Sequence, residues 1–307
     1  MIDERILKNI PGLDTGKTVT CIDAKDMDAK TFAKKFVNTN TPVLIKGGLK
    51  HWPAYEKWPQ PGYLEEVGKD SEVNYYRHMN FSSDSSMKAS AKKHNFAQAL
   101  TEMRSGLDEV LFAPVSFKAE GFKKLQKDMT GFPFIEKKPR PLAYPDARMF
   151  VYKGAGSNWH LHVLDETLMC QIHGNKRVAL FPSDDGNYKE LKEIFYSDAL
   201  LKDENCMAHL ADKIEPYVVD VEAGDTLYIP PNWWHGVQPV DHEVGMTIPY
   251  CWRSPYHKIS NLRYPAIRDL YKDAFKKPGL PMLVVPFYGL ITLFAQCIYR
   301  TKLLAGR

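Results

Sequence analysis

The sequence has few cysteines and no strong excess of charge of either sign. Its 307 residues include five cysteines, none of which stands in a CxxC arrangement: Cys21, Cys170, Cys206, Cys251 and Cys297. An odd number of widely spaced cysteines argues against a disulfide framework and favours reduced thiols in a cytosolic setting. The 41 basic and 37 acidic residues leave a net charge of +4, which gives no argument for nucleic acid as a partner.

Long apolar runs are also scarce. The first 25 residues are polar, and we expect no secretory signal peptide there. The strongly apolar stretch lies near the other end, at residues 280–299, and is interrupted by Pro281, Pro286, Gly289 and Gln296. A run of about 20 apolar residues is long enough to span a bilayer, but these interruptions weaken that interpretation. We expect a C-terminal helix that packs on the core or pairs two subunits, with association to a membrane as the alternative.

Short β-type segments separated by glycine and proline make up most of the central chain. With 44% hydrophobic and 25% charged residues, the composition is that of a globular protein. The pattern predicts helices at residues 26–37, 63–67 and 96–103, and strands at 148–152, 168–171, 177–181, 217–220, 226–229 and 244–252. Many short strands with turn residues between them indicate a barrel or a sandwich. The polar residues 79–95 are typical of a loop or lid.

Two histidines separated by one residue lie near the centre of the chain. His160 and His162 belong to the stretch GAGSNWHLHVLDETLMCQIHG at residues 154–174, and Glu166 follows four residues after His162. Side chains two apart on a β-strand leave the same face, so a strand here directs both imidazoles to one side. Imidazoles bind Zn, Cu, Fe and Ni, so the pair supplies half of a metal site. Two ordinary strand histidines are the alternative.

A second stretch, GDTLYIPPNWWHGVQ at residues 224–238, adds His235 after a strand and a Pro-Pro turn. Together the two stretches resemble the paired motifs of the cupin superfamily, and the GD…PPNWWH wording is close to the signature of its JmjC-type (cupin-8) oxygenases. The matching positions are Gly154, His160, His162, Glu166 and Gly174 in the first motif, and Gly224, Pro230 and His235 in the second. Further likeness at residues 41–58 and 171–182 extends the resemblance over residues 25–256.

This resemblance implies a mainly β fold with flanking helices, built on the double-stranded β-helix, or jelly-roll, of cupins. We expect a catalytic domain at residues 1–256, with an N-terminal α/β decoration at 1–140 and a jelly-roll core at 141–256. Residues 257–307 then form C-terminal helices, through which JmjC hydroxylases often dimerise.

One position departs from the JmjC pattern. Members of this branch bind Fe(II) with His-x-Asp/Glu and a distal His, and His162 stands where the carboxylate belongs. Three interpretations follow. In the first, the ligands are three histidines, or three histidines with Glu166 as a fourth ligand, as in many other cupins. In the second, the altered site still binds Fe(II) and is active, and in the third it has lost redox chemistry. In the alternative interpretation Glu166 faces solvent or orients a ligand imidazole.

The resemblance also implies 2-oxoglutarate as a co-substrate, whose far carboxylate needs a cation. Lys176 falls at the position of the family's 2-oxoglutarate lysine, and a buried lysine is a suitable counter-charge. A surface hairpin lysine is the alternative. The other residues expected at the co-substrate are Ser157, Thr167, Tyr152 and Tyr250. Tyr152 shares a strand face with His160 only if the strand continues across Gly154 and Gly156.

We therefore predict an Fe(II)- and 2-oxoglutarate-dependent oxygenase that uses O2 to hydroxylate a protein side chain or a small metabolite. One alternative is a cupin enzyme that uses Mn, Fe, Ni or Zn without 2-oxoglutarate, which His162 and Glu166 favour. Another is a catalytically silent cupin that binds a partner. Lys176 and the WWH sequence favour the oxygenase. We expect a cytoplasmic protein, peripheral to a membrane only if residues 280–299 bind one, and no nucleic-acid partner.

Overall fold

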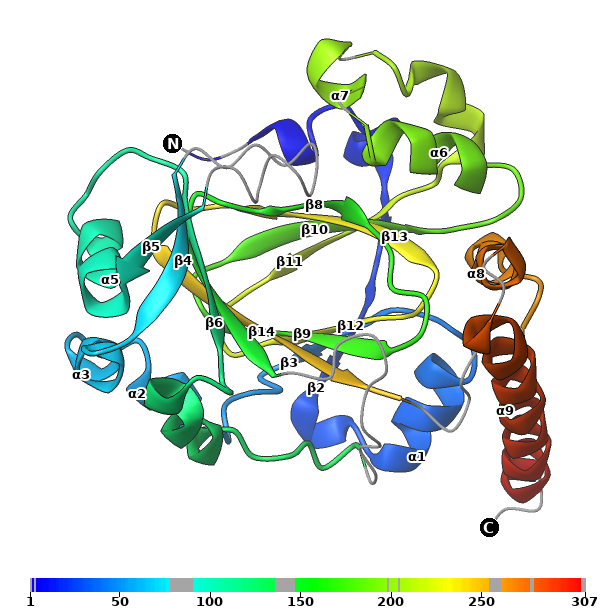
Figure 1. Ribbon diagram of the computed structural model, residues 1–307, viewed down its shortest axis with the longest axis horizontal. Coiled ribbons are helices and arrows are strands. Elements are labelled where there is room, and N and C mark those ends of the chain that lie inside the picture. The colour runs from blue at the N-terminus through cyan, green and yellow to red at the C-terminus, as the bar shows by residue number, and fades with distance from the viewer. Residues whose placement is uncertain are drawn as a thin grey trace.

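Two β-sheets face each other at the centre of the molecule, and helices lie outside them (Figure 1). The structure is a computed structural model that describes residues 2, 4–77, 91–135, 147–197, 199–203, 205–253, 261–276 and 279–304. The smaller sheet contains β1 (Lys17–Thr18), β8 (Ser157–His160), β10 (Lys176–Pro182), β11 (Tyr217–Val221) and β13 (Trp233–Pro239). The larger sheet contains β2 (Thr20–Asp23), β3 (Val43–Lys46), β4 (Glu72–Arg77), β5 (Lys92–Asn95), β6 (Leu111–Ser116), β7 (Arg148–Lys153), β9 (Glu166–His173), β12 (Thr226–Ile229) and β14 (Val244–Trp252).

The strand order shows a jelly-roll in which distant segments alternate. It is β1-β11-β10-β13-β8 in the smaller sheet and β2-β3-β12-β9-β14-β7-β6-β4-β5 in the larger. Within the described residues, neighbouring strands are antiparallel except for the pairs β1–β11 and β2–β3. The predicted strands 226–229 and 244–252 are confirmed with those bounds.

The α-helices are short except at the C-terminus. They are α1 (Ala29–Thr31), α2 (Pro53–Lys57), α3 (Tyr63–Gly68), α5 (Phe96–Arg104), α6 (Tyr188–Phe195), α7 (Ala199–Lys202), α8 (Pro265–Lys276) and α9 (Leu280–Leu304). The helix predicted at residues 26–37 begins at Ala29 and is capped by Asp28, whose side chain accepts a hydrogen bond from Thr31 N. It continues from Phe32 to Val37 as a π-helix.

Successive side chains along each strand point to opposite faces of its sheet, and the apolar ones form three layers. The inner cluster between the sheets combines Met169, Leu227 and Ile229 with Val178, Leu180 and Val237 of the smaller sheet. The outer cluster covers the far face of the larger sheet and includes Leu168, Cys170 and Tyr228 together with residues of α3 and α5. A third cluster packs α6 on the smaller sheet. Full burial of one aliphatic side chain contributes about 1.5–3 kcal/mol, so these layers fix which face of each strand points inward.

The polar segment predicted as a loop or lid at residues 79–95 is described only in part. Residues 79–90 lie outside the described residues, as does the proline-rich stretch 136–146. The end of the segment is a strand, because β5 pairs antiparallel with β4. The loop prediction is therefore wrong for Lys92–Asn95, where the sheet compensates for a polar sequence through backbone pairing.

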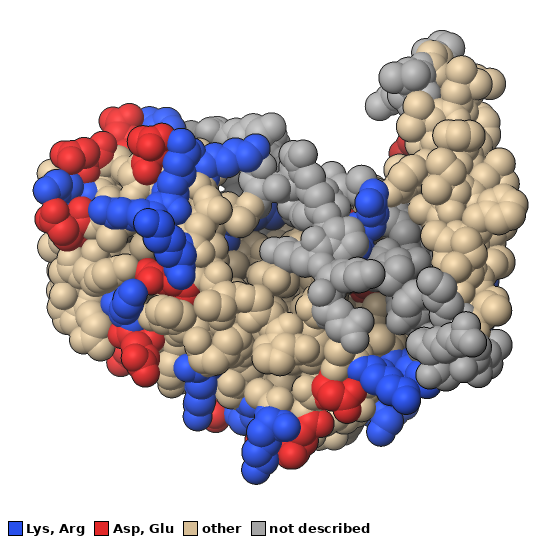
Figure 2. Space-filling model, turned by 90° about the horizontal axis from the view of Figure 1, so that it is seen from below, with Lys and Arg blue, Asp and Glu red and all other residues tan. Residues whose placement is uncertain are grey.

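The C-terminal helix packs along one side and exposes the rest of its surface. Tyr271 of α8 lies against Gly289, and Arg253 Nη1 donates a hydrogen bond of 2.6 Å to Tyr288 Oη. Opposite this contact, Phe287 and Phe294 are 65% and 70% exposed. Figure 2 shows this arm nearly free of charged side chains. No helix among the described residues has the length and apolar character that crossing a membrane requires. Pairing of two subunits through α9 stays a prediction.

Candidate metal centre

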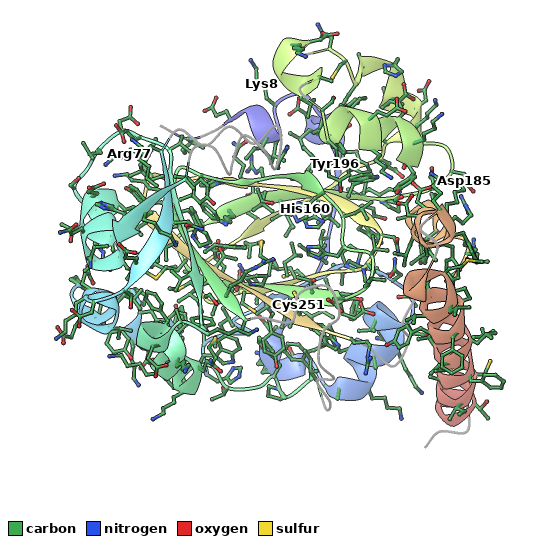
Figure 3. The ribbon with its side chains drawn as sticks, viewed as in Figure 1. Lys8, Arg77, His160, Asp185, Tyr196 and Cys251 are labelled. Atoms are coloured by element: carbon green, nitrogen blue, oxygen red, sulfur yellow. The ribbon has the colours of Figure 1, made fainter. Side chains whose placement is uncertain are left out.

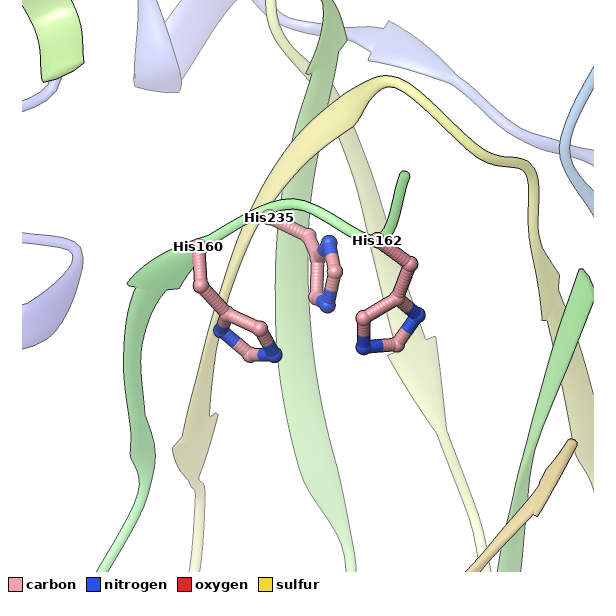
Figure 4. Close-up of side chains that lie close together, drawn as sticks. All are labelled: His160, His162 and His235. Carbon is pink, nitrogen blue, oxygen red and sulfur yellow. The ribbon is translucent and has the colours of Figure 1, made fainter. Parts of the chain in front are cut away.

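Three histidines meet on the inner side of the smaller sheet. His160 ends β8, His162 lies in the turn after it, and His235 lies within β13. His160 and His235 stand opposite each other in the pairing of β8 with β13. One ring nitrogen from each of the three lies within 4.8 Å of the others. Figure 4 shows the three rings turned toward a common point, and Figure 3 places His160 between the two sheets.

The two motifs hold each other in place through their backbones. The expected single strand through both histidines is not observed, because β8 ends at His160. His162 is positioned instead by Asn232 of the Pro-Pro turn, whose backbone N–H donates a 2.7 Å hydrogen bond to His162 O. Asn232 has a φ of 63°, a left-handed conformation that asparagine adopts more readily than most residues. The turn before His235 therefore positions the histidine of the first motif.

Each imidazole is oriented from behind through its Nδ1 atom. His160 Nδ1 lies 2.7 Å from Asn158 O, and His235 Nδ1 lies 3.0 Å from Trp233 O. A carbonyl oxygen only accepts, so these two Nδ1 atoms carry the proton and the Nε2 lone pairs are left for a metal. His162 Nδ1 lies 2.8 Å from Thr167 Oγ1, which completes the set. Such contacts fix the tautomer and direction of metal-binding histidines.

Burial keeps all three imidazoles neutral. Burial lowers the pKa of His160, and it holds the pKa values of His162 and His235 well below the ordinary value. The positive charge of Arg148 adds to this effect at His160 and His162. Metals bind the neutral form of histidine, so the site is prepared for an ion without competition from protons near neutral pH. Three nitrogen donors on one side suit Fe, Zn, Cu or Ni.

Glu166 points away from the three histidines. It is 2% exposed and accepts a 2.6 Å hydrogen bond from Tyr228 Oη, which belongs to the outer cluster. Thr167, the next residue on β9, faces His162, and consecutive strand residues face opposite sides of a sheet. Among the described residues, the side chains grouped closely enough to hold one ion here are the three histidines alone. The structure thus does not place Glu166 as a fourth ligand.

A second polar group lies on the same inner side, toward the other end of the strands. Lys176 is 5% exposed, and its Nζ atom lies 3.8 Å from the centroid of the Tyr152 ring. Gln171 Nε2 donates a 2.8 Å hydrogen bond to Tyr152 Oη, and Thr247 Oγ1 donates one of 2.7 Å to Gln171 Oε1. We call Lys176, Tyr152, Gln171 and Thr247 the polar cradle. Gly245 faces the Tyr152 ring directly, and a Cβ atom there has no room.

The cradle holds a buried cation without an internal counter-charge. Within the described chain, no residue makes a hydrogen bond or ion pair with the Lys176 ammonium. Burial lowers the pKa of Lys176 to about 7. A buried, unpaired ammonium is unfavourable, and an anion beside it restores the charged form. The cradle is therefore suited to a carboxylate.

The other residues expected at the co-substrate lie elsewhere. Ser157 Oγ lies 3.3 Å from His160 Nδ1, and Thr167 lies behind His162, so both are beside metal-site imidazoles. Tyr250 packs in the outer cluster against Trp52 and Phe132, with ring centroids 6.0 and 4.9 Å away. Tyr250 lies three positions after the inward-facing Thr247, and this odd spacing puts the two on opposite faces of β14. Of the residues that the sequence predicted at the co-substrate besides Lys176, Tyr152 alone belongs to the cradle.

Sequence reasoning missed Gln171 and Thr247. Neither is one of the matched motif positions, and the signal for Gln171 is its position four residues after Thr167 on one strand, which gives both the same face. Thr247 enters the cradle through the pairing of β14 with β9, which places it opposite Gln171.

Comparison with known proteins agrees with this geometry. The family model described as a cupin-like domain matches residues 29–258. The chain belongs to the cupin-like domain family. The expected architecture, mainly β with flanking helices and a jelly-roll core, is thereby confirmed for this cupin-like protein.

Curated relatives of the cupin-like protein include JmjC proteins. It is 27% identical over 238 residues to Jumonji C domain-containing protein 5 of Drosophila melanogaster, covering 73% of this chain and 58% of that protein. It is 26% identical over 282 residues to Arginine-specific demethylase JMJ22 of Arabidopsis thaliana, covering 83% and 51%. It is 26% identical over 240 residues to tRNA wybutosine-synthesizing protein 4 of Gibberella zeae, covering 75% and 23%. The chain thus spans less than two thirds of each of these relatives, and they support an oxygenase-type family without fixing the reaction.

Proposed function

We propose that this cupin-like protein is an Fe(II)- and 2-oxoglutarate-dependent oxygenase that hydroxylates its substrate. The observation that carries the proposal is Lys176, a buried ammonium without a counter-charge on the same inner side as three neutral histidines. A metal-binding group and an anion-binding group on one inner face suit a ligand with an acidic group at each end.

The strand register gives the separation of the two groups. Leu180 of β10 pairs with His235, and Lys176 lies four residues before Leu180. At ~3.3 Å per residue, the backbones of Lys176 and His235 stand roughly 13 Å apart along the strand. Both side chains reach inward, and in this proposal a five-carbon dicarboxylic acid bridges the distance between them.

Each group has a separate task in this proposal. His160, His162 and His235 would hold the metal, and iron bound there supplies the activation of oxygen. Lys176 binds the far carboxylate of 2-oxoglutarate, while the hydrogen bonds of Gln171 hold the Tyr152 ring in position. The apolar inner cluster keeps water away from the enclosed ligand.

We place the substrate, a protein side chain or a small metabolite, at the start of β7. Arg148 and Phe150 lie on the same face of this strand as Tyr152. The Arg148 guanidinium lies 5.2 Å from the Phe150 ring centroid, and Phe112 lies 5.5 Å from the same ring. These half-buried rings offer an apolar surface beside the metal site, since the charge of Arg148 acts on His160 and His162.

The test is anaerobic titration of the Fe(II)-loaded protein with 2-oxoglutarate, followed by its visible charge-transfer absorption. We expect a saturable band, its loss in Lys176→Ala, and its retention in the matched exposed-lysine variant Lys127→Ala. Succinate release after admission of oxygen then shows turnover. A band of equal affinity in Lys176→Ala, or no band in the iron-loaded wild type, would refute the proposal.

The three-His donor set favours a second candidate, a cupin enzyme that uses Mn, Ni or Zn without 2-oxoglutarate. His162 supplies a neutral nitrogen where JmjC-type oxygenases have a carboxylate. Tightly bound metal in the purified protein, with no effect of 2-oxoglutarate on its spectrum or stability, supports this candidate over the first.

A further inference from the structure

A polar cavity lies on the outer face of the larger sheet, behind the polar cradle. It has a volume of about 270 Å³ and lies between α5 and the ends of β7, β9 and β14. Its lining residues are Pro59, Met103, Arg104, Lys153, His173, His242, Glu243, Val244 and Met246. The volume is smaller than the ~300–1,000 Å³ of pockets for drug-sized ligands, so a small occupant fits it.

Lys153 is the buried cation of this cavity. It is 6% exposed, and it follows Tyr152 on β7, so the two side chains leave opposite faces of the sheet. In residues 4–77, 91–135, 147–197 and the other described segments, no hydrogen bond or ion pair involves its ammonium. A lysine buried to this extent without an opposite charge is unfavourable. The arrangement therefore needs an anion from outside the chain.

The neighbouring charged groups have other partners. Arg104 forms an ion pair with Glu65 of α3. The carboxylate of Glu243 lies 3.6 Å from His173 Nε2 at the rim, and its side chain is 67% exposed. The described acidic side chains around the cavity thus face solvent or other cations. Lys153 supplies up to three N–H donors inside the cavity, and His173 supplies another at its edge.

We propose that this cavity is a binding site for a small oxyanion, with Lys153 as its charged partner and His173 as a rim donor. The shared chemistry is a negatively charged oxygen head group, either a phosphate or a short carboxylate. The site lies on the opposite face of the sheet from the three histidines and does not depend on the proposed oxygenase function.

The position of the cavity also predicts which backbone segments become more protected when an anion binds. Lys153 adjoins Tyr152 of the cradle, and His173 O accepts a 2.6 Å hydrogen bond from Gln171 Nε2. Val244 precedes Gly245, which faces the Tyr152 ring. An anion bound between these strand ends restricts the motion of the backbone segments that carry the cradle residues. We expect slower amide exchange at the ends of β7, β9 and β14 when it binds.

The experiment is calorimetric titration of the full-length, metal-free protein with inorganic phosphate. We compare wild type with Lys153→Met, Lys153→Arg and Lys176→Met, after circular dichroism has shown that each is folded. We expect saturable binding in wild type, at least tenfold weaker binding in Lys153→Met, retention in Lys153→Arg and no change in Lys176→Met. The Lys176→Met variant separates this cavity from the cradle, which also attracts anions.

Two results would overturn the proposal. One is the absence of saturable phosphate binding to wild type; the other is binding that survives Lys153→Met or is lost in Lys176→Met. Hydrogen exchange of wild type with and without phosphate tests the location without any substitution: protection elsewhere than at the three strand ends contradicts it. Competition with acetate distinguishes the two kinds of head group. If acetate displaces phosphate, the site accepts a carboxylate; if acetate does not displace phosphate, the natural ligand is a phosphate.

Discussion

Replacing Lys176 by methionine is expected to stabilise the ligand-free protein while it removes 2-oxoglutarate binding. Methionine has a similar length, fits beside the Tyr152 ring and carries no charge. In wild type the folded state disfavours the charged lysine, because burial lowers its pKa from 10.5 to about 7. The lysine stays protonated in the unfolded state, so at pH 7.5 folding is accompanied by release of the proton from most of the molecules.

The size of the effect follows from linkage between protonation and folding. At pH 7.5 the unfolded lysine is charged and the folded one is mostly neutral, which costs on the order of 4 kcal/mol. The folded pKa lies below the unfolded one, so this penalty is full below pH 7 and disappears as pH rises toward 10.5. At pH 10 about 1 kcal/mol of it remains. The stability difference between Lys176→Met and wild type should therefore narrow with rising pH.

Urea unfolding of the metal-free proteins at pH 7.5 and pH 10 measures this difference directly. Lys127→Met, which replaces an exposed lysine, is the matched control and should differ little from wild type at either pH. A Lys176→Met variant no more stable than wild type at pH 7.5 would show that the ammonium has a counter-charge. A gain that stays constant between the two pH values would show that better packing, and not charge, is its cause.

Three further predictions concern other parts of the molecule. Thr167→Val removes the hydroxyl beside His162 Nδ1 and should weaken metal binding by about 10–100-fold in a competition assay with a chelator. The control Thr167→Ser should bind the metal normally. Equal metal affinities of Thr167→Val and wild type would show that Thr167 does not orient the His162 ring. Binding of 2-oxoglutarate at pH 7.5 should take up most of one proton, because the bound carboxylate raises the low pKa of Lys176. Calorimetry in two buffers of different ionisation enthalpy measures this proton uptake. A binding enthalpy that is the same in both buffers would contradict the prediction. If α9 pairs two subunits, Phe287→Glu with Phe294→Glu should convert a dimer into a monomer in sedimentation, and a wild type that is monomeric at tens of micromolar would exclude this pairing.

The sequence predicts well that the three histidines meet and that Lys176 is buried, while the role of Lys176 at a co-substrate stays a prediction. The spacing of the histidines is set by motif loops of fixed length, and the structure brings His160, His162 and His235 together as that spacing indicates. Strand bounds in the centre of the chain were also predictable, because glycine and proline mark the turns.

The direction of individual side chains was harder to predict. On a strand, an error of one residue reverses the face, and the pairing of β14 with β9 shifts register between Met246 and Thr247. Tyr250 therefore points to the outer cluster, and Glu166 lies on the face opposite Thr167. The cradle residue Thr247 depends on pairing between strands distant in sequence, which local patterns do not contain.

The division of the site between the two sheets has a consequence for how such a protein changes over evolutionary time. The three histidines and Lys176 belong to the smaller sheet and the turn after β8, whereas the other cradle residues, Tyr152, Gln171 and Thr247, belong to the larger sheet. If the cradle binds the proposed co-substrate, mutations in β7 or β14 can alter the shape of the cradle while the three histidines remain intact. A lineage built on this fold can then change its co-substrate without first losing the histidine cluster.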